Sequence, residues 1–145
     1  MNKKMNFDNL ESKLLSLLKE KENTIIAIDG KSGIGKTRIV KNLKRFYGSS
    51  MIVWTSEKFV SIIVNALKSE TNPISVLKTM EESILVIEDI DCGLIGKQIT
   101  QRRIAHILQN LLEDYKIIIT GIELNKRIPD VINNIEKHLI FLELE

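Results

Sequence analysis

Short apolar runs alternate along this chain with longer segments in which apolar residues recur at intervals of three and four. The runs are typical of buried strands and lie at residues 24–29, 51–54, 84–87, 116–120 and 139–144. The periodic segments predict helices from about residue 8, at residues 36–47, from residue 56, at 74–80 and at 100–115. Strands that alternate with helices indicate an α/β fold with a parallel sheet covered on both faces.

Local residue chemistry suggests where these elements begin and end. Asp8 or Asn9 is expected to cap the first helix, and Ser56 is expected to cap the third. Both prolines, Pro73 and Pro129, fall in predicted loops. Cys92 comes just after a predicted buried strand, so we expect it to pack against the core.

The length and composition of the chain limit the kinds of protein to which it can belong. At 145 residues the chain is long enough for one domain with its own core, expected to span residues 1–145. The net charge of +2 is too small to argue for a nucleic-acid or membrane partner. One cysteine excludes an internal disulfide, and no apolar run has the length of a signal peptide or of a membrane span of about 20 residues. We therefore expect a cytoplasmic protein.

A glycine-rich loop stands between the first predicted strand and the helix that follows it. Its residues are Gly30, Lys31, Ser32, Gly33, Ile34, Gly35, Lys36 and Thr37. Strand, loop and helix in this order are the context of a Walker A motif, whose backbone N–H groups surround phosphate oxygens beside a helix N-terminus. Lys36 would reach the β- and γ-phosphates, and the Thr37 hydroxyl would bind Mg²⁺. We predict that these residues, with Arg38 after them, bind a nucleoside triphosphate.

Two acidic residues follow the apolar run at residues 84–87 and give it the form of a Walker B strand. Glu88 could bind Mg²⁺, and Asp89 could orient the attacking water. Thr120 ends the next buried run, where it would contact the γ-phosphate or the water, or would serve only as a turn residue before Gly121. The residue pattern leaves both interpretations of Thr120 open.

Several stretches resemble the bacterial replication initiator DnaA, in an order and spacing that the family shares. They are residues 7–9, 54–60, 64–67, 87–91, 97–101, 110–113, 117–121 and 128–129, together with His106. The match therefore extends from about Phe7 to Leu144. The stretch at 87–91 resembles the Walker B strand of that family, and the stretch at 117–121 resembles its sensor-1 strand.

The resemblance implies an AAA+ core, a P-loop NTPase with a five-stranded parallel sheet in the order 5-1-4-3-2. It also implies ATP as the nucleotide, bound with Mg²⁺. The pair of helices that the family inserts after its second strand would correspond to residues 56–80 and would help to grip single-stranded DNA. Lys58, Lys68 and Lys78 lie in that region.

The chain also departs from the family in ways that bear on catalysis. Family members usually have two aspartates where this chain has Glu88 and Asp89, and they carry an arginine finger soon after the sensor-1 strand. The corresponding stretch, residues 131–138, contains no arginine, and Lys137 lacks the planar fork of a guanidinium. The sequence stops at Glu145, where the family continues into a helical lid with a sensor-2 arginine. We expect slow hydrolysis at most.

Three functional hypotheses remain open from the sequence. The leading one is a DnaA-like AAA+ module that uses Mg·ATP or ADP as a switch in DNA replication or its control, as a monomer or in an ATP-dependent assembly. The alternative is a non-enzymatic regulator that docks on a full-length initiator or a helicase. The least favoured is a small phosphotransferase, because no arginine-rich lid segment follows the Walker B strand.

Overall fold

The computed structural model describes residues 3–77 and 83–145, and these build a six-stranded parallel sheet. The strand order is β1-β6-β2-β5-β4-β3, and all the pairings are parallel. The strands are β1 (Lys3–Met5), β2 (Ile25–Asp29), β3 (Met51–Thr55), β4 (Ile84–Glu88), β5 (Lys116–Gly121) and β6 (Leu139–Leu144).

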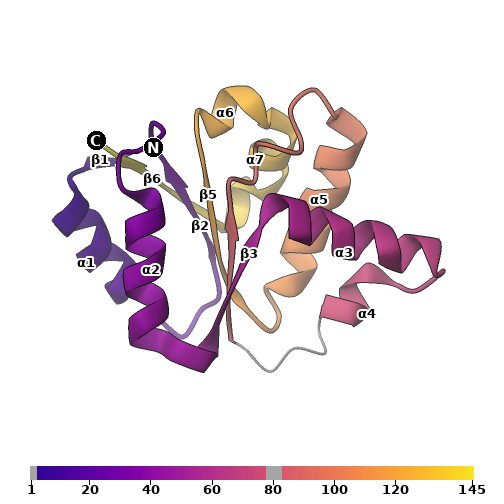
Figure 1. Ribbon diagram of the computed structural model, residues 1–145, viewed down its shortest axis with the longest axis horizontal. Coiled ribbons are helices and arrows are strands. Elements are labelled where there is room, and N and C mark those ends of the chain that lie inside the picture. The colour runs from indigo at the N-terminus through magenta and orange to yellow at the C-terminus, as the bar shows by residue number, and fades with distance from the viewer. Residues whose placement is uncertain (1–2, 78–82) are drawn as a thin grey trace.

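Helices cover both faces of this sheet (Figure 1). They are α1 (Phe7–Leu18), α2 (Lys36–Tyr47), α3 (Ser56–Lys68), α4 (Pro73–Leu77), α5 (Gln98–Leu111), α6 (Leu124–Arg127) and α7 (Pro129–Ile135). Short 3₁₀ turns occupy Gly48–Ser50 and Glu136–His138. None of the helices in the described part of the chain is both long and apolar enough to cross a membrane.

Two apolar layers hold the helices against the sheet. Strand β2 contributes to both, because successive side chains of a strand point to opposite faces: Ile26 and Ile28 pack with α1 and α2, while Ile25 and Ala27 pack with the opposite helices. Figure 1 shows α1 and α2 on one side of the sheet and α5 and α7 on the other. A parallel sheet buried on both faces explains why its strands read as continuous apolar runs.

The five strands predicted from the apolar runs are confirmed, and their spatial order β6-β2-β5-β4-β3 is the expected 5-1-4-3-2. The count of five was wrong, because β1 adds a sixth strand at the edge. Lys3 pairs with Leu142, and Met5 pairs with Leu144. A strand of three residues with two lysines has no apolar run to reveal it, and its pairing depends on β6, far away in the sequence.

The predicted helix caps were one residue or more too late. Helix α1 is capped by Asn6, whose Oδ1 accepts a hydrogen bond from the Asn9 N–H at 2.9 Å, so neither Asp8 nor Asn9 is the cap. Helix α3 is capped by Thr55, whose Oγ1 accepts from the Lys58 N–H at 3.1 Å. Ser56 is instead the first helical residue and is buried.

Three further expectations need correction. Pro73 and Pro129 begin α4 and α7, at the first helical position, where proline costs no hydrogen bond. The predicted helix at 74–80 is described only as far as Leu77, and the residues beyond it lie outside the described part. Cys92 is exposed and not packed in the core, because it lies in the turn after β4 and not on the strand.

Candidate functional site

The phosphate loop lies between the end of β2 and the start of α2, as its sequence predicts. Gly33 and Gly35 have φ values of +77° and +125°, which side chains other than glycine rarely adopt. A Cβ at Gly35 would also meet the ring of Phe7 at 3.2 Å. The Gly30 N–H donates to the carbonyl of Gly121 at 3.2 Å, so the loop begins in contact with β5.

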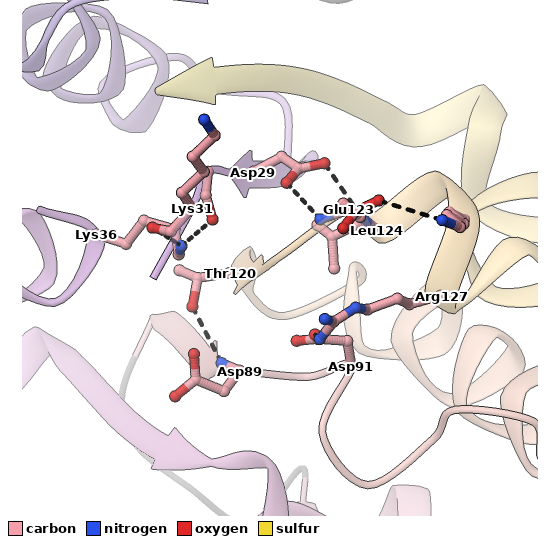
Figure 2. Close-up of polar contacts among 11 residues, drawn as sticks. Asp29, Lys31, Lys36, Asp89, Asp91, Thr120, Glu123, Leu124 and Arg127 are labelled. Carbon is pink, nitrogen blue, oxygen red and sulfur yellow. Dashed lines mark hydrogen bonds and ion pairs between the residues drawn. The ribbon is translucent and has the colours of Figure 1, made fainter. Parts of the chain in front are cut away.

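Lys36 lies folded back on this loop. Its side chain is 8% exposed, and Nζ donates to the carbonyl oxygens of Gly30 and, at 2.9 Å, of Lys31 (Figure 2). Burial lowers the pKa of Lys36, and the carboxylates of Asp89 and Asp29 oppose this effect. The ammonium group is therefore a positive charge inside a loop of converging backbone groups.

The Walker B residues leave the end of β4 in two different environments. Glu88 is half-buried, and its pKa is raised first by burial and then by the charge of Asp89. Asp89 is exposed and has φ +54°, a left-handed conformation that aspartate tolerates better than most residues. Its N–H donates to Thr120 Oγ1 at 3.1 Å, so the hydroxyl of the buried Thr120 fixes the turn (Figure 2).

A cleft of about 290 Å³ joins the two motifs. Its walls are Ser32, Gly33, Gly35, Lys36, Thr37, Asp89 and Ile122. The sheet register explains this meeting, because β2 pairs with β5 and β5 pairs with β4, all parallel, so their carboxyl ends lie at one edge. Loop residues from one strand and an acid from another therefore face the same space.

The remaining predicted site residues lie around this cleft. Gly30, Lys31 and Ile34 line a larger cavity of about 580 Å³ that shares Ile122 with the cleft. Arg38 is exposed, and its guanidinium lies 3.8 Å from the centre of the Phe7 ring. Glu88 and Thr37 together line a groove between α2 and β3.

Sequence reasoning missed Asp29, the last residue of β2. Its carboxylate accepts hydrogen bonds from the backbone N–H groups of Glu123, at 2.9 Å, and of Leu124, at 3.1 Å (Figure 2). Burial raises the pKa of Asp29, and these two hydrogen bonds oppose the rise. The sequence did contain a signal for Asp29, because this polar residue ends an apolar run just before Gly30.

Sequence reasoning also missed an ion pair beyond the Walker B residues. Arg127 Nη1 donates to Asp91 Oδ2 at 3.0 Å, and the Asp91 side chain is 1% exposed. Asp91 Oδ1 is buried and has no hydrogen-bond partner among the described residues. The arginine-free stretch at 131–138 therefore follows an arginine that is already paired with an acid of the Walker B turn.

Helix α3 carries exposed side chains of the predicted contact region. Lys58 and Lys68 of α3 are exposed, and Val64 and Leu67 between them are 40% and 49% exposed. Lys78, the third lysine of the predicted contact region, lies outside the described residues. Helix α3 therefore presents apolar and basic side chains together.

Comparisons with known proteins agree with this geometry. The family described as the bacterial DnaA ATPase domain matches residues 9–142. The chromosomal replication initiator protein DnaA of Mesoplasma florum is 31% identical over 119 residues, which cover 78% of this chain and 26% of that protein. The chain spans about a quarter of the length of the curated relatives that it matches.

Solved structures show the same fold. AMPPCP-bound DnaA from Aquifex aeolicus is 25% identical, with a TM-score of 0.67 over 94% of this chain and 45% of that chain. A replication initiator DnaA bound to AMPPCP and single-stranded DNA is 24% identical, with a TM-score of 0.70 over 97% of this chain and 46% of that one. Because the family match runs through nearly the whole chain, this protein belongs to the bacterial DnaA ATPase domain family and has its AAA+ P-loop fold.

Proposed function

We propose that this chain binds Mg·ATP or Mg·ADP in the cleft between the phosphate loop and Asp89, and acts as a cytoplasmic switch module in DNA replication or its control. The observation that carries the proposal is the cleft itself, in which Gly33, Gly35, Lys36 and Asp89 face one space. The AMPPCP-bound relative from Aquifex aeolicus supports a nucleotide in this place.

The phosphate loop would hold the phosphates by charge and by directed N–H groups. The positive φ values of Gly33 and Gly35 curl the backbone, and the N-terminus of α2 adds its dipole. An ammonium group has three donors, and the structure places Lys36 Nζ on the carbonyls of Gly30 and Lys31. Arg38 would lie beside the nucleotide, at the start of the same helix.

The donor set around the cleft suits Mg²⁺. Thr37 and Asp89 line the cleft, and Glu88 lies beside Thr37, so the candidate ligands are all oxygens, which Mg²⁺ prefers. Burial first, and then the charge of Asp89, raises the pKa of Glu88, and a bound cation would offset both effects. Thr37 and Glu88 would hold the ion, which would neutralise charge on the phosphates.

Hydrolysis would depend on Asp89 and would be slow. Asp89 would orient the attacking water, and Thr120 would keep the Asp89 backbone in its left-handed conformation through the hydrogen bond at 3.1 Å. Arginine fingers contribute about 10³–10⁵ to the rate in other P-loop enzymes. Residues 131–138 hold no arginine, and Arg127 is paired with Asp91. We therefore propose nucleotide binding, not rapid turnover, as the main activity.

Titration of a fluorescent ATP analogue tests this proposal. Lys36→Ala should weaken binding about 10- to 100-fold, because a hydrogen bond to a charged group contributes about 1.5–3 kcal/mol. Arg45→Ala is the matched control, since Arg45 is an exposed cation at the far end of the same helix. Unchanged affinity in a folded Lys36→Ala variant would overturn the assignment. Phosphate release by the same preparations should be slow compared with about 1–100 s⁻¹.

For the partner, we propose single-stranded DNA on α3, with a protein partner, an initiator or a helicase, as the alternative. The support is the relative bound to single-stranded DNA and the exposed Lys58 and Lys68. The exposed Val64 and Leu67 are the observation that favours a protein partner, because apolar side chains gain from burial at an interface.

A further inference from the structure

The four-residue helix α6 has a side-chain contact at each end, one to the residue before the phosphate loop and one to the Walker B turn. At its start, both oxygens of the Asp29 carboxylate accept backbone N–H groups, from Glu123 and Leu124. These N–H groups belong to the first turn, where a helix has no internal acceptors. Because Asp29 directly precedes Gly30, the start of α6 is tied to the start of the loop.

The end of α6 is tied to the Walker B turn. Arg127, its last residue, donates to Asp91, which stands two residues after Asp89. Figure 2 shows Asp29 beside Glu123 and Leu124 at the start of this segment, Arg127 beside Asp91 at its end, and Thr120 next to Asp89. The Asp91 side chain is only 1% exposed, so little solvent reaches the carboxylate of this ion pair. Dissolved salt therefore screens the pair less than it screens an ion pair at the surface.

Packing leaves α6 little freedom to move by itself. Leu124 is fully buried, and the Asp91 carboxylate lies against Gly121, where a Cβ would come within 2.5 Å of Oδ1. Glu123, just before the helix, has φ +47°, a conformation that costs free energy in a residue other than glycine. This strained residue turns its own N–H and that of Leu124 onto Asp29.

We propose that α6 is a bridge that sets the position of the Walker B turn relative to the phosphate loop, with Asp29, Asp91 and Arg127 as positioning residues. This inference rests on the proposed nucleotide function. A shift of the loop would reach Asp91 through α6, and a shift of the turn would reach Asp29 by the same path. None of the three side chains needs to touch the nucleotide for this role.

The bridge predicts a loss that depends on the nucleotide. ADP would be held mainly by the loop, whereas ATP with Mg²⁺ would also engage the Walker B turn through its γ-phosphate. Damage to the bridge should therefore reduce the preference for ATP over ADP in Mg²⁺. A residue that merely stabilised the fold would lower thermal stability and leave that preference unchanged.

Affinities for ATPγS and ADP, each measured with Mg²⁺ and with EDTA, test the bridge. Arg127→Gln should reduce the ATPγS-to-ADP preference in Mg²⁺ about fivefold, the size of a coupling between contacting residues. Asp29→Asn, at the other end of α6, should change the same ratio, and the two effects should not add. Arg103→Gln is the matched control, because Arg103 is an exposed arginine of α5.

Arg127→Gln leaves a buried, unpaired carboxylate and could prevent folding. Two further variants test the bridge in that case. Arg127→Lys keeps the charge, and Asp91→Asn combined with Arg127→Gln removes both charges. Because Arg127→Lys keeps a cation for Asp91, it should retain the ratio. An unchanged ratio in the folded double variant would overturn the bridge while leaving the proposed function standing. Wild-type protein that binds neither nucleotide would overturn both. A reduced ratio in the double variant and in Asp29→Asn, with Arg127→Lys and Arg103→Gln unaffected, would support the bridge.

Discussion

Gly121 offers a direct test of how tightly α6 and the Walker B turn pack against β5. An ideal Cβ at this position would lie 2.4 Å from Leu124 Cδ2 and 2.5 Å from Asp91 Oδ1, whereas carbon atoms in contact prefer about 3.5–4.0 Å. The ends of side chains can often move aside. These two cannot do so freely, because Leu124 is fully buried and Asp91 is held by Arg127.

The expected cost of Gly121→Ala follows from two opposing effects. Overpacking a buried site destabilises by about 1–3 kcal/mol. Replacing glycine by alanine restrains the unfolded chain and returns about 0.4–1 kcal/mol. We therefore expect a net loss of about 1–2 kcal/mol in the free energy of unfolding, or about 3–8 °C in Tm for a domain of this size.

Urea denaturation of nucleotide-free protein measures this loss, and the m-value should not change. Gly93→Ala is the control, because a Cβ at Gly93 would meet only Ser56 Oγ, at 3.2 Å, and should cost less than about 0.5 kcal/mol. If Gly121→Ala proved as stable as Gly93→Ala, then Leu124 and Asp91 would have room to move. The tight packing on which the bridge depends would then be refuted.

Two further predictions concern charge. The pKa of Glu88 is raised above its ordinary value of 4.5, so the folded protein favours the protonated acid and loses this stability as pH rises through the folded-state pKa. Glu88→Gln should therefore raise the Tm of nucleotide-free protein at neutral pH, with the gain shrinking toward pH 4.5; a gain that persists in acid would contradict this reasoning. If α3 binds single-stranded DNA, reversing Lys58 and Lys68 to Glu should flatten the salt dependence of binding by about 0.7 per lost phosphate contact, measured by fluorescence anisotropy. Lys19→Glu, at the exposed residue that follows α1, should leave the slope unchanged, and a wild type that binds no DNA at low salt would favour a protein partner.

Elements with local physical causes could be predicted from the amino-acid sequence. A glycine loop between an apolar run and a periodic segment predicted a phosphate loop, because φ requirements and apolar spacing are properties of neighbouring residues. The apolar runs also located five strands, and the family resemblance supplied their order. Glu88 and Asp89 were predicted as site residues because two acids follow an apolar run that comes after the glycine loop.

Contacts between residues that are distant in the sequence could be found only from the folded chain. Asp29 meets the N–H of Glu123 across 94 positions, and Asp91 meets Arg127 across 36, so no local pattern indicates either pair. The same reason hid β1, which exists as a strand only through its pairing with β6. Cys92 was misplaced because the chain turns immediately after β4, and Thr120 on the neighbouring strand contributes a hydrogen bond to that turn.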